Sequence, residues 1–152
     1  MMDASSSTIV VRELLSKGQA IELRARGLSM LPSIWPGQWL RVVPCNFSDV
    51  KVADVVLSVN VSRLLAHRVF SLSPDSTMLT TWGDANKLSD EPTPSSDLLG
   101  RVSHHTLFRH HLWVPTSSLY GRAFLSLSFL ARPCSCLLGR LMGFLVRHKS
   151  IL

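Results

Sequence analysis

The chain of 152 residues has only three cysteines, Cys45, Cys134 and Cys136. So small and odd a number excludes a disulfide framework, and a Cys-x-Cys pair without further thiols has poor spacing for zinc. We therefore expect reduced thiols. The first fifteen residues, MMDASSSTIVVRELL, lack both the basic segment and the uninterrupted apolar segment of a secretory signal peptide.

The sequence also lacks an apolar run of about 20 residues, the length that a membrane-spanning helix needs. The best candidate lies near the end, where Arg132, Pro133 and Arg140 interrupt it. Two helices, over 117–131 and 134–147, are predicted there, and the second carries a basic stripe. We expect residues 114–152 to lie on a membrane surface, with a crossing or a helix packed on the domain as alternatives. The predicted localisation is membrane-associated or cytoplasmic.

Acidic residues are in the minority, with 10 against 16 lysines and arginines, and the formal net charge is +6. Such a balance suits nucleic acid or an anionic membrane. The basic residues gather after Gly100, but no helix-turn-helix fits into the roughly eighteen residues that precede the strand-rich part of the chain. We expect no nucleic-acid partner.

Hydrophobic residues make up 46% of the chain, enough to bury the core of one domain. A helix is predicted over residues 5–17, ended by Gly18. Runs typical of strands follow, separated by turn signals such as Pro36-Gly37. We predict a mainly β domain over 1–113 with a short N-terminal helix, and a helical C-terminal segment over 114–152. The predicted strands are Ala20–Arg26, Trp39–Val43, Asp54–Val61, Arg63–Leu72, Met78–Thr81 and Leu98–Leu107.

The stretch GLSMLP places Ser29 directly after an alternating strand. Gly27 allows a tight turn there and Pro32 prevents the strand from continuing, so Ser29 is held out of the sheet. Most serines at such turns are caps or turn residues. A catalytic serine also needs a base within hydrogen-bond reach and donors for the oxyanion.

His67, in the strand RLLAHRVF, is the best candidate for that base. A lone histidine in a strand is more often a structural side chain. The segment TTWGDANKLSD offers two carboxylates to orient the imidazole, Asp84 and Asp90, and each taken alone is typical of a turn or a cap. Only the combination of the serine, the histidine and a carboxylate indicates a catalytic site.

Five segments, GLSMLPSIWPGQWL, VADVV, LAHRVF, TTWGDANKLSDEP and LLGRV, occur in this order within residues 19–103. In order and separation they resemble the signal-peptidase and LexA-type serine peptidase superfamily. The resemblance implies a β-rich catalytic core that hydrolyses peptide bonds through a serine nucleophile. It implies a polypeptide substrate, which we expect to lie extended along an exposed strand edge.

Carried over by position, Ser29 is similar to the nucleophile and Met30 to the residue that follows it. His67 stands where bacterial leader peptidases and LexA-type repressors have a lysine, and no lysine occurs between Lys51 and Lys87. The chain therefore resembles the Ser-His branch found in the endoplasmic reticulum, in archaea and in some bacteria. By the same resemblance Asp84 and Asp90 match the aspartates of the last loop, and Asp90 is the preferred partner of His67.

Gly27 stands where some leader peptidases have a serine that donates to the oxyanion. The backbone N–H of Ser29, with that of Gly27 or Met30, is expected to serve instead. A regulatory domain that cleaves only itself or a fused partner is one alternative, and a domain of the same fold that binds without cleaving is another.

Histidines 104, 105, 110 and 111 form the pattern His-His-x4-His-His, which suggests a divalent metal ion. No cysteine, aspartate or glutamate accompanies them, and the next carboxylate upstream is Asp97. A basic surface next to the C-terminal segment explains the histidines as well. We expect no metal site and no cofactor.

Overall fold

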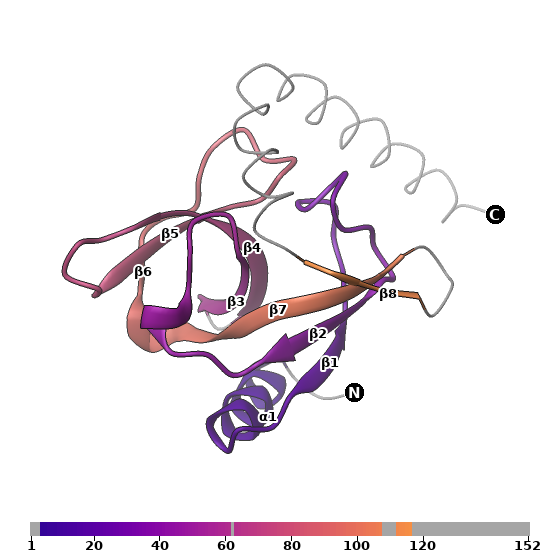
Figure 1. The fold of residues 1–152 in the computed structure, drawn as a ribbon, viewed down its shortest axis with the longest axis horizontal. Coiled ribbons are helices and arrows are strands. Elements are labelled where there is room, and N and C mark those ends of the chain that lie inside the picture. The colour runs from indigo at the N-terminus through magenta and orange to yellow at the C-terminus, as the bar shows by residue number, and fades with distance from the viewer. Residues whose placement is uncertain (1–3, 62, 108–111, 117–152) are drawn as a thin grey trace.

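The computed structural model describes residues 4–61, 63–107 and 112–116 (Figure 1). Within these residues it is mainly β, which confirms the predicted class. The elements are helix α1 (Ala4–Ser16), strands β1 (Ile21–Arg24), β2 (Trp39–Val43), β3 (Val55–Asn60), β4 (Arg63–Leu72), β5 (Met78–Trp82), β6 (Thr93–Pro94), β7 (Leu98–Leu107) and β8 (Leu112–Pro115), and the 3-10 turns η1 (Phe47–Asp49) and η2 (Ser95–Asp97).

All eight strands join one antiparallel sheet, in the order β1-β2-β7-β3-β4-β5-β6, with β8 paired to β7. The bounds of β2, β4 and β7 are those predicted. Strands β6 and β8 were not predicted. Figure 1 shows β7 running through the middle of the molecule, where it pairs with β2, β3 and β8.

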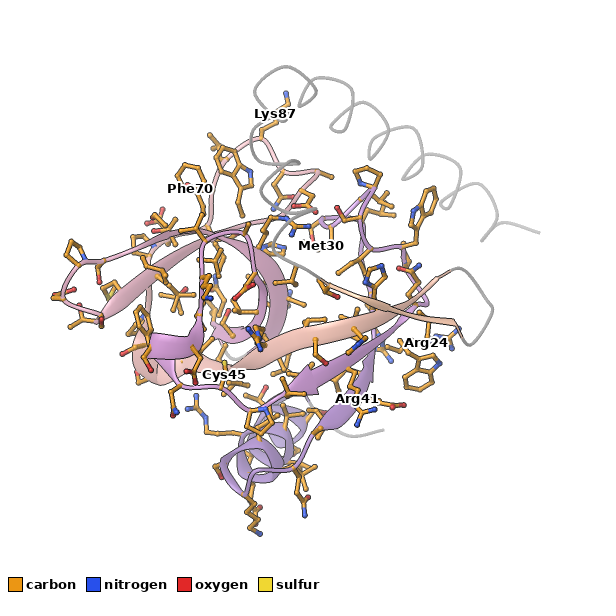
Figure 2. The ribbon with its side chains drawn as sticks, in the orientation of Figure 1. Arg24, Met30, Arg41, Cys45, Phe70 and Lys87 are labelled. Carbon is orange, nitrogen blue, oxygen red and sulfur yellow. The ribbon has the colours of Figure 1, made fainter. Side chains whose placement is uncertain are left out.

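The alternation of each strand decides which side chains are buried. In β2, Leu40 and Val42 are buried while Trp39 and Arg41 are exposed, and Figure 2 shows Arg41 at the outer surface. Strand β3 instead begins with four buried residues, because both of its faces are covered. Val55 and Leu57 belong to one core cluster, which also contains Val11 and Leu15 of α1. Val56, on the other face of β3, belongs to a second cluster with Val50, Val69 and Leu79.

Strand β4 changes its pairing along its length. Residues Arg63–Arg68 pair with β3, whereas pairing with β5 begins only at Arg68. The first half of β4 therefore has no strand partner on its other side within the described residues. The outer side of β1 is likewise an edge, because β1 ends the strand order. These two open edges border the site described below.

The sheet extends to Pro115 of β8, beyond the domain boundary expected at residue 113. The predicted helices over 117–131 and 134–147, and with them the expected membrane-surface segment, lie outside the described residues. In the part of the chain that the structure describes, no helix is long and apolar enough to cross a membrane.

Candidate active site

Ser29 lies in the loop between β1 and β2, at the transition from exposed to buried chain. Gly27, with φ of +79°, turns the backbone through the left-handed region that favours glycine. The side chains of Met30 and Ile34 are then anchored in the core cluster, and the Ile34 N–H donates to the Met30 carbonyl at 2.9 Å. The Ser29 side chain is thereby held between a glycine turn and a buried anchor.

The hydroxyl of Ser29 lies 2.8 Å from Nε2 of His67, and Nδ1 of His67 lies 2.6 Å from Oδ2 of Asp90. A carboxylate only accepts hydrogen bonds, so Nδ1 carries the proton and donates it to Asp90. In a neutral imidazole Nε2 is then the acceptor, and Ser29 donates to it. The three residues form a continuous hydrogen-bonded chain, with His67 only 3% exposed.

Thr81 on β5 supports the carboxylate of Asp90. Its hydroxyl donates to Oδ2 at 2.6 Å, and its carbonyl accepts the backbone N–H of Asp90 at 2.8 Å. The Thr81 side chain is fully buried. Sequence reasoning did not single out Thr81, because threonine is common in strands and nothing else marks this one.

Asp84, the other aspartate proposed as a partner of His67, contacts Arg68 instead. Its two oxygens accept from Nε and Nη2 of Arg68 at 2.9 and 2.8 Å, and both side chains are buried. Arg68 also donates to the carbonyl of Ala53 at 2.9 Å and to the hydroxyl of Ser33 at 3.3 Å. Asp84 thus lies in an ion pair beside the hydrogen-bonded chain and is not part of it.

The loop after β5 holds the backbone of Ser29 from the opposite side. The N–H of Ala85 donates to the Ser29 carbonyl at 2.8 Å. A Cβ added at Gly83 would lie 2.8 Å from that same oxygen and 2.7 Å from Nδ2 of Asn86. Only glycine at position 83 lets this loop approach Ser29 so closely. The Asp84–Arg68 pair, one residue later, fixes the same loop.

The backbone N–H groups of Gly27, Ser29 and Met30, expected to form the oxyanion site, donate no hydrogen bond to any residue that the structure describes. A Cβ at Gly27 would meet no atom of the described residues within 4 Å. Amides next to the hydroxyl, without a partner among the described residues, are the donors that a developing oxyanion requires.

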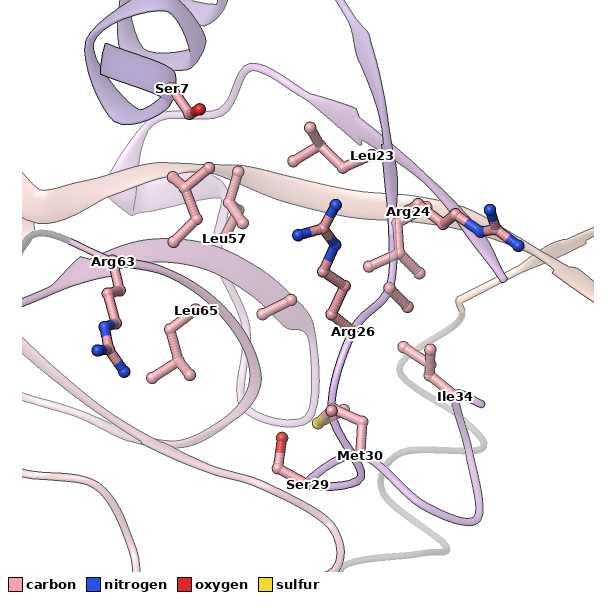
Figure 3. A pocket seen from close by; sticks show the side chains of 15 residues that line it. Ser7, Leu23, Arg24, Arg26, Ser29, Met30, Ile34, Leu57, Arg63 and Leu65 are labelled. Atoms are coloured by element: carbon pink, nitrogen blue, oxygen red, sulfur yellow. The ribbon is translucent and has the colours of Figure 1, made fainter. Parts of the chain in front are cut away.

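A groove of about 500 Å³ begins at Ser29 and runs between β1 and β4 (Figure 3). Its lining is mostly apolar and includes Met30, Ile34 and Leu57. The residues of β1 and β4 that border it belong to the two open strand edges. Arg24, Arg26 and Arg63 are its charged members.

The histidines considered for a metal site do not form one within the described residues, where no group of three metal-ligating side chains occurs. His104 and His105 are consecutive on β7, and Nδ1 of His105 lies 3.0 Å from the Thr116 hydroxyl. Burial, with smaller contributions from Arg68 and His104, lowers the pKa of His105. Residues 110 and 111 lie outside the described part of the chain.

No protein-family model matches the chain, and a comparison with curated proteins likewise returned no match.

Proposed function

We propose that the protein is a serine endopeptidase that cleaves polypeptides with Ser29 as nucleophile, His67 as general base and then acid, and Asp90 orienting the imidazole. The observation that carries the proposal is the chain of two short hydrogen bonds from Ser29 through His67 to Asp90. A serine hydroxyl alone is a weak nucleophile, and this arrangement supplies the base and the group that holds it.

In the first half of the reaction, Oγ of Ser29 attacks the carbonyl carbon of the scissile bond and its proton passes to Nε2 of His67. The carbonyl oxygen takes up the negative charge, which the backbone N–H groups of Ser29 and a neighbour stabilise. Asp90, a carboxylate that accepts from Nδ1, stabilises the imidazolium. When the carbon–nitrogen bond breaks, Nε2 returns the proton to the leaving amine and an acyl ester remains on Ser29.

In the second half, His67 takes a proton from water, and the resulting hydroxide attacks the ester carbonyl. The ester bond breaks, Nε2 donates its proton to Oγ of Ser29, and a peptide with a free carboxylate leaves. The burial of His67 helps, since electrostatic interactions strengthen where water is excluded.

The groove supports a polypeptide as the substrate. Its walls include the unpaired edges of β1 and of the first half of β4. An extended peptide that pairs with one or both edges gains main-chain hydrogen bonds whatever its sequence. The apolar lining then receives alternate side chains of the substrate.

The resemblance to Ser-His signal peptidases also supports this proposal. The serine loop, the histidine strand and the aspartate loop that carry the resemblance are the three segments that meet at the site. No lysine contacts Ser29 within the described residues, in keeping with a histidine base.

The proposal is tested by incubating the purified chain with a mixture of unmodified peptides and identifying new termini by mass spectrometry. Ser29→Ala and His67→Ala are expected to abolish cleavage while keeping the circular dichroism of the wild type. Ser48→Ala, at an exposed serine in η1, is the matched control and should cleave normally. Full activity in either site variant would contradict the mechanism.

A self-cleaving domain is separated from an endopeptidase by mixing active chain with an excess of the Ser29→Ala chain and added peptides. Cleavage of added peptides supports the endopeptidase. Cleavage of the chain alone, at a rate independent of its concentration, supports the self-cleaving alternative. Peptide binding without any cleavage would indicate a domain that only binds.

A further inference from the structure

The groove beside Ser29 has two kinds of surface. Its apolar part includes Leu23 on β1, Ala25 just after β1, and Leu64 and Ala66 on β4, which also pack on the core cluster. Because successive side chains of a strand point to opposite faces, Arg63, Leu65 and His67 share the other face of β4. A peptide lying between the two edges therefore directs alternate side chains to the apolar part and toward the side of Arg63.

Two arginines that line the groove have no partner in the described chain. Arg26 and Arg63 line the groove and are exposed, and the guanidinium of neither contacts a carboxylate or a carbonyl among the described residues. Elsewhere Arg12 and Arg68 pair with aspartates, and Arg24 donates to the Gly37 carbonyl. Figure 3 shows the Arg26 side chain reaching into the space between β1 and β4 toward Leu23, whereas the Arg63 side chain points the other way, on the side of Leu65.

None of the described residues that line the groove is acidic, so none of them balances the charge of these arginines. Exposed guanidinium groups in water need no partner. When a peptide fills the groove, however, part of their hydration is lost, and a carboxylate on that peptide restores the lost hydrogen bonds. The groove is therefore better suited to an acidic peptide than to a neutral or basic one.

The position of the charge along the peptide follows from strand geometry. Arg63 precedes His67 by four residues, which is about 13 Å along an extended strand. Arg26 precedes Ser29 by three residues across the glycine turn. A peptide whose scissile bond lies at Ser29 thus brings to Arg63 a side chain about four residues from that bond.

We propose that this groove selects acidic peptides, with an aspartate or glutamate about four residues from the cleaved bond bound by Arg63 and with Arg26 as a second cation that favours acidic side chains. This inference rests on the proposed peptidase function and names its substrate class. The unpaired strand edges favour a peptide over an anionic lipid, because they offer main-chain donors and acceptors that pair with another extended chain.

The first experiment measures kcat/KM for peptides built on a cleaved sequence, with Glu or Gln placed two to six residues from the cleaved bond. We expect Glu at one position near the fourth to be favoured by about 10-fold, the size of a charge-assisted hydrogen bond. The Arg26→Gln/Arg63→Gln variant should lose that preference, so that its kcat/KM values for the Glu and the Gln peptides become equal. Arg41→Gln, at an exposed arginine on β2 outside the groove, is the matched control.

Replacing the arginines by glutamate gives a stricter test of the charge preference. Arg63→Glu and Arg26→Glu should each weaken the preference for Glu, and the double reversal should favour Lys at the same position. Equal kcat/KM for the Glu and Gln peptides in the wild type would overturn the inference, and so would an acidic preference that both arginine variants retain.

Binding separates this inference from the proposed function. Ser29→Ala keeps the groove, and fluorescence anisotropy should show tighter binding of the Glu peptide than of the Gln peptide, with the difference lost in Ser29→Ala/Arg26→Gln/Arg63→Gln. Should the wild type cleave nothing, peptides drawn from a random acidic library still serve as ligands. Indifference to peptide charge, together with arginine-dependent binding to phosphatidylserine vesicles, would overturn the inference in favour of a lipid surface.

Discussion

His67 and Arg68 are consecutive on β4, yet each contacts a different aspartate of the same loop. Their side chains point to opposite faces of the strand. The pair of His67 with Asp90 reaches Ser29 and the groove, whereas the pair of Arg68 with Asp84 is enclosed between the serine loop and the loop after β5. An imidazole gains and loses protons near neutral pH and a guanidinium does not. One pair therefore suits proton transfer, and its neighbour suits holding two loops together.

The largest expected effect is the loss of activity in a variant of Asp90. Asp90→Asn should lower kcat by about 10⁴-fold, because an amide no longer holds the imidazole in the tautomer that accepts the Ser29 proton. The free energy of unfolding should change much less than in the Arg68 and Asp84 variants. Peptide cleavage and urea unfolding measure the two effects, with Glu91→Gln, at the exposed neighbouring residue, as the control. Near-normal cleavage by Asp90→Asn would remove Asp90 from the mechanism.

Substitutions in the Arg68–Asp84 pair are expected to lower stability more than activity. Arg68→Met or Asp84→Asn should lower the free energy of unfolding by about 3–5 kcal/mol, since each leaves a buried charge without its partner. Activity should fall only as far as the serine loop is displaced. Replacing both residues together should cost less than the sum of the two changes, as urea unfolding of the double-mutant cycle will measure. Additive losses would mean that the two side chains do not act as a pair.

Thr81 tests how far the proton-transfer pair depends on its support. Thr81→Val keeps the shape of the side chain but removes the donor to Asp90, which should lower kcat by about 10-fold, the value of a hydrogen bond to a charged group. A positioning role further predicts an altered pH profile of kcat and an unchanged KM. The adjacent Thr80→Val is the control. An unchanged pH profile in Thr81→Val would reduce Thr81 to a packing role.

A smaller effect on stability is expected at Gly27, and its cause is the conformation of the backbone. Gly27→Ala places a Cβ at φ of +79°, which should lower the free energy of unfolding by about 1 kcal/mol through strain alone, because that Cβ meets no atom of the described residues within 4 Å. Thermal unfolding will measure the loss. A loss above about 3 kcal/mol would show a contact that the open turn does not predict.

The smallest effect concerns the titration of His105. The folded protein holds the pKa of His105 below its ordinary value of 6.5. Between the folded and the unfolded pKa the unfolded chain binds more protons, so stability decreases as pH falls from 6.5 through this window and levels off below it. His105→Gln should reduce this decrease in urea-unfolding curves. An identical pH dependence in the variant would assign the effect to other groups.

Much of the fold follows from local pattern. Trp39–Val43, Arg63–Leu72 and Leu98–Leu107 are strands with the predicted bounds because clear turn signals flank long runs of strand-forming residues. Strand β6 has only two residues, one of them a proline, and pairs with the preceding strand β5, while the short strand β8 pairs with the preceding strand β7. Strands this short leave little trace in local sequence.

The site was predicted in part. Ser29, His67 and both aspartates were named, and the preference for Asp90 agrees with its contact to His67. The choice between the aspartates rested on resemblance, because both lie in one loop and spacing alone does not say which face of β4 each reaches. The arginines of the groove were missed, since an unpaired charge is defined by what surrounds it in three dimensions.

The central claim, that His67 activates Ser29, is tested most directly by labelling with a fluorophosphonate probe and mapping the adduct by mass spectrometry. The account predicts one adduct, on Ser29, formed far more slowly in His67→Ala and at the wild-type rate in Ser48→Ala. A probe that leaves Ser29 unmodified in the folded wild type, or that modifies it equally fast without His67, would contradict the account.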